Sequence, residues 1–157
     1  LRVPVSLCED YKDERPFMKR GLTRSHRATK MTENEIGEIV VDRAVRLHKA
    51  LGPGLLETVY EVILAHELEA SGLRIFRQMA VPIKYGELIF DEGFRADIVV
   101  EDKVILELKS VESTTKAHKK QVLTYLRLTG MKLGYLLNFG EALMRDGIFR
   151  ILNGTVT

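Results

Sequence analysis

The chain has 157 residues, 45% apolar and 29% charged, a composition typical of a globular domain long enough to bury a sizeable core. No apolar run approaches the roughly 20 residues of a membrane-spanning helix, and the first residues show no signal-peptide pattern. We therefore expect a cytoplasmic protein. The single cysteine, Cys8, excludes a disulfide framework and has no partner at a metal-ligand spacing.

The formal net charge of +2 is unevenly distributed along the chain. Residues 1–30 hold eight Lys or Arg against four Asp or Glu, whereas residues 31–157 hold sixteen against eighteen. The larger part is slightly acidic, so its net charge gives no support for nucleic-acid binding. Because residues 1–30 also lack periodicity, we expect a flexible N-terminal extension ahead of a domain at 31–157. A basic arm that binds phosphates is the alternative for this extension.

Two amphipathic helices are predicted at the start of the domain. Thr32 and Glu35 have the spacing of a capping box, and apolar residues then recur at helical intervals as far as the Gly-Pro-Gly turn at 52–54. A second helix is expected over 55–72, where Gly72 supplies the stop signal. Glu57 lies in the first turn of this second helix.

Strands are predicted next. Residues 75–83 partly alternate between apolar and polar, and Pro82 indicates an edge position because it has no N–H to donate. A short strand at 88–90 follows a turn around Gly86. Two runs rich in β-branched and aliphatic residues, 94–100 and 104–109, then form a β-hairpin.

The rest of the chain predicts a helix that joins two parallel strands. Ser113 or Thr114 caps this helix, which ends at 129–130, and the apolar run 133–137 is a strand buried on both faces. A short helical segment at 141–144 and a last strand at 148–152 complete the chain. The fold class is therefore α/β with a mixed sheet.

The register of the hairpin brings charged residues together. If Val100 pairs with Val104 across the three-residue turn, Asp97 stands opposite Glu107. Side chains opposite each other in an antiparallel pair have Cβ atoms about 5 Å apart. Lys109 lies two residues beyond Glu107 and therefore points to the same face. Two carboxylates and an ammonium are expected to converge there.

This trio has the chemistry of a metal-dependent hydrolase. Hard cations such as Mg²⁺ prefer carboxylate oxygens, so Asp97 and Glu107 suffice to hold one. The ion would activate a water and stabilise charge on a scissile phosphate, while Lys109 would orient the water or neutralise the developing charge. The simpler interpretation is that charged and aliphatic residues alternate along any half-exposed strand.

Three further residues lie near this site in the predicted fold. An acid such as Glu57 is favoured at a helix start by the helix dipole alone. Gln121 and Tyr125 are four residues apart on one face of the crossover helix, which begins where the Lys109 strand ends. In the ordinary interpretation Tyr125 belongs to the core and Gln121 to its boundary.

A basic cluster at the start of the crossover helix is a candidate for nucleic-acid binding, since free helix N–H groups already favour phosphate. A solvated basic patch is an equally good interpretation of these four residues: Lys116, His118, Lys119 and Lys120. Surface or boundary positions are expected for three other histidines: His26, His48 and His66. Asn138 is expected in a turn, with an amide that reaches a ligand as the alternative.

Together these motifs resemble the GxxExxY proteins, a branch of the PD-(D/E)XK nuclease superfamily. The resemblance covers about residues 31–154 and leaves out residues 1–30. It is carried by the segments Gly54-Leu55-Leu56-Glu57-Thr58-Val59-Tyr60, Arg95-Ala96-Asp97, Glu107-Leu108-Lys109, Gln121-Val122-Leu123-Thr124-Tyr125 and Leu136-Leu137-Asn138-Phe139-Gly140.

The resemblance implies a restriction-endonuclease-like mixed sheet flanked by helices and Mg²⁺-dependent, or Mn²⁺-dependent, hydrolysis of phosphodiesters. It assigns the metal to Asp97 and Glu107 with help from Glu57, and it places Lys109 beside the attacking water. Gln121 and Tyr125 match the Q-x3-Y element of several nuclease branches. Ala96 replaces the proline before the aspartate, a change that removes no ligand.

Two function classes follow from this resemblance. The first is a metal-dependent nuclease acting on DNA, or with less support on RNA. The second is a catalytically silent module that keeps the fold and binds a protein or nucleic-acid partner, since members of this superfamily can retain the architecture after losing the activity. A homodimer is expected for the first class, because cutting both strands of a duplex from one centre per chain takes two copies.

Overall fold

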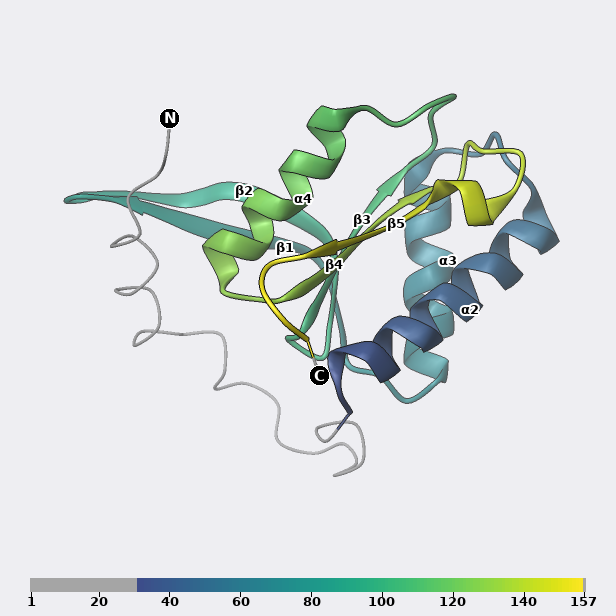
Figure 1. Ribbon diagram of the computed structural model, residues 1–157, viewed down its shortest axis with the longest axis horizontal. Coiled ribbons are helices and arrows are strands. Elements are labelled where there is room, and N and C mark those ends of the chain that lie inside the picture. Colours follow the sequence, from purple (N-terminus) through teal and green to yellow (C-terminus); the bar gives the residue numbers. More distant parts are fainter. Residues whose placement is uncertain (1–30, 157) are drawn as a thin grey trace.

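The computed structural model describes residues 31–156 as a five-stranded mixed sheet with helices on both faces (Figure 1). The strands lie in the order β1-β2-β3-β4-β5. Helices α2 and α3 pack on one face and α4 packs on the other. This arrangement confirms the predicted α/β class. The predicted extension at 1–30 lies outside the described residues.

Both N-terminal helices form where the sequence predicts them. Helix α2, Glu33–Leu51, begins with the predicted capping box between Thr32 and Glu35. Helix α3, Glu57–Ala70, follows the Gly-Pro-Gly turn. In α2, His48 is buried, contrary to prediction, because its Nε2 lies 2.8 Å from the backbone carbonyl oxygen of Glu141.

His66 is exposed on α3, as predicted, and His26 lies outside the described residues. Within residues 31–156, none of the helices has the length and apolar composition needed to cross a bilayer.

Strands β1, Ile75–Tyr85, and β2, Leu88–Val100, form a long hairpin that projects from the body of the molecule (Figure 1). Strand β1 is an edge strand, as Pro82 predicts. The prediction of separate strands at 88–90 and 94–100 is wrong. Gly93 does not break β2, because its missing side chain leaves room for Ile83, whose Cγ1 lies 2.1 Å from where a Cβ would stand.

The β2–β3 hairpin has the predicted register as far as it is paired. Strand β3, Val104–Lys109, pairs antiparallel with β2 at Val100↔Val104, Val99↔Ile105 and Ile98↔Leu106. Strand β4, Leu133–Asn138, is parallel to β3, as predicted, and fully buried. Strand β5, Ile148–Leu152, pairs antiparallel with β4.

Helix α4, Lys116–Thr129, crosses from β3 to β4. Its N-cap is Thr115 and not Ser113 or Thr114, because Thr115 and His118 form a reciprocal capping pair. The short helix predicted at 141–144 starts later, as the 3-10 turn η4 at Met144–Gly147. The buried side chain of Met144 fixes the start of η4, since it packs in the core that α2 and α3 share with the sheet.

Asn138 joins the end of β4 to the segment that leaves β3. Its Oδ1 accepts hydrogen bonds from the N–H groups of Val111 (3.0 Å) and Gly140 (3.1 Å), and its Nδ2 donates to the carbonyl of Val111 at 2.9 Å. The side chain is fully buried, so its amide serves the backbone and does not reach a ligand. This clamp fixes the chain directly after Lys109.

We predict that Asn138→Ala lowers the free energy of unfolding by about 2–4 kcal/mol, because three partly buried backbone groups of Val111 and Gly140 lose their partner. Urea unfolding followed by circular dichroism measures the loss. Asn34→Ala is the control, since Asn34 Oδ1 accepts a hydrogen bond of 2.7 Å from the exposed Arg150 side chain, and its loss should cost less than about 0.5 kcal/mol. Equal effects of the two substitutions would contradict the clamp.

Candidate active site

The site opens where β2 separates from β3. Pairing of the two strands ends at Ile98 and Leu106, one step before Asp97 would meet Glu107. Instead of a backbone carbonyl, the Asp97 carboxylate is the acceptor here: its Oδ2 accepts a hydrogen bond of 2.9 Å from the backbone N–H of Leu108. A side chain thus replaces strand pairing at this position.

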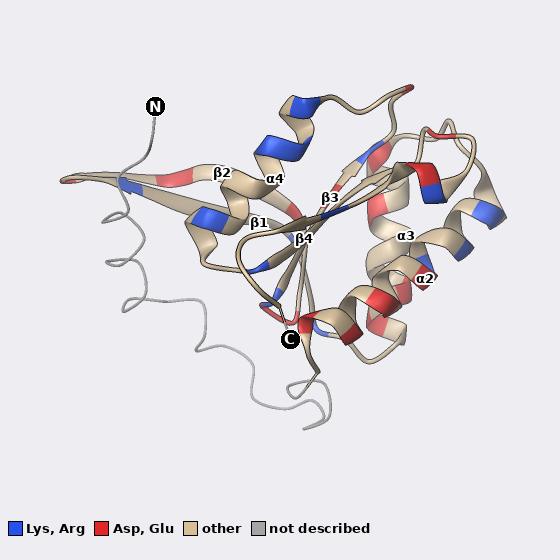
Figure 2. Ribbon diagram, in the orientation of Figure 1, with Lys and Arg blue, Asp and Glu red and all other residues tan. Residues whose placement is uncertain are grey.

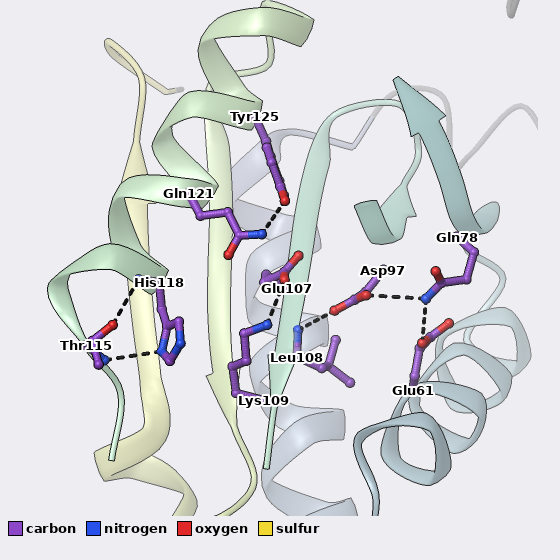
Figure 3. Close-up of polar contacts among 10 residues, drawn as sticks. All are labelled: Glu61, Gln78, Asp97, Glu107, Leu108, Lys109, Thr115, His118, Gln121 and Tyr125. Carbon is purple, nitrogen blue, oxygen red and sulfur yellow. Dashed lines mark hydrogen bonds and ion pairs between the residues drawn. The ribbon is translucent and has the colours of Figure 1, made fainter. Parts of the chain in front are cut away.

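Glu107 lies beside Lys109 on β3, toward Gln121 and Tyr125 of α4 (Figure 3). Its side chain is 6% exposed, and its Oε1 lies 3.1 Å from the ammonium nitrogen of Lys109. Its other oxygen, Oε2, is buried without a hydrogen-bond partner. A buried carboxylate oxygen without a donor is energetically costly, so it indicates an absent cationic or donor group.

Glu57 reaches the same site from the start of α3. Its Oε2 is likewise buried and without a partner. The negative charge of Glu57 acts on both Glu107 and Lys109, so the three side chains share one electrostatic environment. Helix-start chemistry alone does not require a carboxylate oxygen to be buried.

The electrostatics of the site favour a further positive charge. Burial raises the pKa of Glu107 to about 7, with Asp97 and Glu57 adding to the rise and Lys109 opposing it. Burial lowers the pKa of Lys109, but the neighbouring Glu107, Glu57 and Asp97 carboxylates outweigh it, so the pKa is raised overall. Lys109 therefore remains an ammonium, and one such group does not offset the three acids.

Gln121 and Tyr125 border the site from α4. The Gln121 Nε2 donates to the Tyr125 hydroxyl, and the Tyr125 ring stacks on Phe94 with centroids 3.7 Å apart. Burial raises the pKa of Tyr125, and charges of Glu107, Lys109 and Asp97 also act on it. The ring is therefore core, as the ordinary interpretation has it, while the hydroxyl lies toward the acidic group.

The basic cluster lies on the same helix, at the turn before Gln121 (Figure 2). Two of its members have local contacts: His118 caps the helix, and the Lys119 ammonium lies 3.9 Å from the ring centroid of Phe149. Lys116 and Lys120 are exposed. The cluster borders the site without being part of its acidic centre.

Two residues of the site were not predicted from the sequence. Gln78 on β1 donates its Nε2 to Asp97 Oδ1 at 3.3 Å and to Glu61 Oε2 at 2.8 Å. Glu61 lies one helical turn after Glu57, and this spacing was the available signal for its proximity. Gln78 has no sequence signal, because its contact with α3 depends on how the hairpin packs.

The donor set suits a divalent cation. Carboxylate oxygens are the ligands that Mg²⁺ and Mn²⁺ prefer, and Glu57 and Glu107 each hold a buried oxygen without a donor. In the part of the chain that the structure describes, no three His, Cys, Asp or Glu side chains stand close enough to hold a metal ion as they are. Binding would therefore require the Glu57, Asp97 and Glu107 carboxylates to draw together.

In metal-free buffer we predict that stability falls as the pH rises from 5 to 8. The folded-state pKa of Glu107, about 7, exceeds the ordinary glutamate pKa of 4.5, so the folded state binds the extra proton in this window. The stabilisation that this proton contributes is complete below pH 4.5 and is lost as the pH rises through about 7. The free energy of unfolding should fall by at most about 3 kcal/mol.

The measurement is urea unfolding in chelator at several pH values. Glu107→Gln should remove the part of the pH dependence that Glu107 causes. Its free energy of unfolding, compared with wild type, should therefore be more favourable at pH 8 than at pH 5. Glu38→Gln, at an exposed position on α2, serves as the control and should keep the wild-type slope. Parallel profiles for wild type and Glu107→Gln would show that the prediction is wrong.

Comparison with protein families matches residues 34–151 to the PD-(D/E)XK nuclease superfamily. The matched range contains Glu57, Asp97, Glu107 and Lys109. No curated protein and no solved structure matches the chain. Together with the five-stranded mixed sheet, the match confirms the expected restriction-endonuclease-like fold. Since the match extends over most of the sequence, the chain belongs to the PD-(D/E)XK nuclease superfamily.

Proposed function

We propose that this protein is a metal-dependent nuclease that hydrolyses phosphodiester bonds, with DNA favoured over RNA as substrate. The proposal includes Mg²⁺ or Mn²⁺ as cofactor and membership of the GxxExxY branch, whose naming motif contains Glu57. It places the nuclease domain at residues 31–157 and the protein in the cytoplasm. Family membership supports the activity class.

The observation that carries the proposal is the pair of buried carboxylate oxygens without partners, Oε2 of Glu57 and Oε2 of Glu107. The two residues lie 50 positions apart in the sequence, Glu57 on α3 and Glu107 on β3, and the charge of Glu57 helps to raise the pKa of Glu107. A silent module would be under no physical requirement to keep such costly groups together. The pair therefore favours an active enzyme over a binding module.

The roles of the residues follow from their positions. Glu57, Asp97 and Glu107 would hold the cation, which when bound would activate a water and stabilise charge on the scissile phosphate. Lys109 has its ammonium 3.1 Å from Glu107, where it can orient that water and neutralise charge developing on the phosphate. Gln121 and Tyr125 border the metal site on the side of α4.

Substrate binding is assigned to the start of α4. The positive end of the helix dipole and the exposed Lys116 and Lys120 would attract phosphate oxygens. No base-reading motif stands out in the sequence, so the proposal includes no sequence specificity. A homodimer belongs to the same proposal, since one centre per chain cuts one strand at a time.

We predict that Mn²⁺ or Mg²⁺ raises the melting temperature of the wild type. At 100 times its Kd a ligand adds about 2.7 kcal/mol, which corresponds to about 5–10 °C for a domain of this size. Asp97→Asn and Glu107→Gln should abolish the increase, whereas Glu69→Gln, at an exposed position on α3, should retain it. A melting temperature that no metal changes would favour the silent module.

We predict that Lys109→Met lowers kcat about 10²–10³-fold, the usual effect of losing a charge-stabilising group, and keeps the metal-induced rise in melting temperature. Supercoiled, linear, single-stranded and branched DNA and an RNA should be tested. Lys49→Met, exposed on α2, is the control and should cleave like wild type. Undiminished cleavage by Lys109→Met would assign the activity to another site or to a contaminant.

A further inference from the structure

Gln78 has an unusual backbone conformation for a residue inside a strand. Its φ is +49°, in the left-handed region that costs a non-glycine residue free energy. The pairing of β1 with β2 passes from Arg77↔Ile98 to Met79↔Ala96 and skips the level of Gln78 and Asp97. Among residues 31–156, the other non-glycine residues with positive φ are Glu101 and Asp102, which form the β2–β3 turn.

The contacts of Gln78 hold it in this conformation. Its backbone carbonyl accepts a hydrogen bond of 2.8 Å from the Arg95 Nη1, and Arg95 belongs to the same Arg-Ala-Asp segment as Asp97. Its amide nitrogen faces two carboxylate oxygens, Glu61 Oε2 at 2.8 Å and Asp97 Oδ1 at 3.3 Å (Figure 3). If the amide were turned round, its oxygen would face the same two carboxylate oxygens, which also only accept hydrogen bonds. The contacts therefore fix the nitrogen end of the amide toward Asp97.

Glu61 differs from the acids of the proposed metal centre. It is 4% exposed, and both of its oxygens are engaged: Oε1 accepts from the Arg77 Nε at 3.0 Å, and Oε2 accepts from Gln78. Glu57 and Glu107, by contrast, each keep a buried oxygen without a partner. Glu61 is therefore an anchor for Gln78 and not a further ligand.

We propose that Gln78 is a positioning residue of the nuclease centre, which acts through Asp97 and is anchored by Glu61. The proposal rests on the proposed function. With Oδ2 held by the Leu108 N–H and Oδ1 by the Gln78 amide, the Asp97 carboxylate has a fixed orientation and keeps lone pairs for a cation. A neutral amide does this without adding a positive charge that would compete with the metal.

The test compares Gln78→Gly with Asp102→Gly. Both substitutions relieve a left-handed non-glycine residue, but only Gln78 lies beside Asp97. Gln78 is exposed, so its replacement leaves the core intact. We expect Gln78→Gly to weaken the apparent Kd for Mn²⁺, measured by calorimetry without nucleic acid, about 10–100-fold, the usual effect of losing a partner of a metal ligand.

Kinetics separate positioning from a merely structural role. In Gln78→Gly, kcat should fall with the metal affinity, whereas KM for DNA should stay at the wild-type value. Asp102→Gly should retain the wild-type Kd for Mn²⁺. Glu61→Gln should weaken Mn²⁺ binding less than Gln78→Gly does, and the double variant should be no weaker than Gln78→Gly alone, since both act through one contact.

An unchanged Kd for Mn²⁺ in Gln78→Gly, or additive effects in the double variant, would overturn the positioning role and leave the proposed nuclease function standing. Absence of Mn²⁺ binding and of cleavage in the wild type itself would overturn both. The two failures are therefore distinguishable from the same set of titrations.

Discussion

The hydrogen bond from the Leu108 N–H to the Asp97 carboxylate determines where the central hairpin stops pairing. On one side of it, Val99, Val100, Val104 and Ile105 are fully buried and continue the core. On the other side, the strands no longer pair, and the backbone hydrogen bond of an ordinary ladder is replaced by one to a side chain. The acidic side chains lie where this pairing ends, next to paired residues that are buried and apolar. Every functional inference depends on this separation.

Charge is the second constraint on the site. The charges of Glu57 and Asp97 act on Glu107 while Lys109 supplies a single positive charge, and the high pKa of Glu107 results mainly from its burial. Such a group of acids is unfavourable in isolation and becomes favourable when a cation is shared among them. Arg77 and Gln78 donate to the carboxylates of Glu61 and Asp97, which have no unpartnered oxygen, and Arg95 donates to the backbone carbonyl of Gln78. They stabilise the frame and leave the centre acidic.

The sequence predicted the parts of the fold that follow from local rules. The capping box at Thr32, the edge position of Pro82 and the pairing of Val100 with Val104 depend on neighbouring residues, and all are found. The errors of prediction occur where contacts between segments far apart in the sequence determine the structure. His48 is buried by a contact with Glu141, 93 residues later, and β2 continues through Gly93 because Ile83 packs there. For the site, the hairpin register predicted Asp97 opposite Glu107, but pairing stops one step before them and Asp97 bonds the Leu108 N–H instead. Gln78 could not be foreseen, because nothing in its neighbours indicates a left-handed backbone.

The central claim is that Glu57, Asp97 and Glu107 surround one divalent cation. Anomalous diffraction from a crystal grown with Mn²⁺ tests it most directly, because it locates the ion without relying on activity. The account predicts an anomalous peak within coordination distance of all three carboxylates, about 2.0–2.3 Å from their oxygens. A peak elsewhere, or a Glu107 carboxylate that stays bonded to Lys109 alone at saturating Mn²⁺, would contradict it.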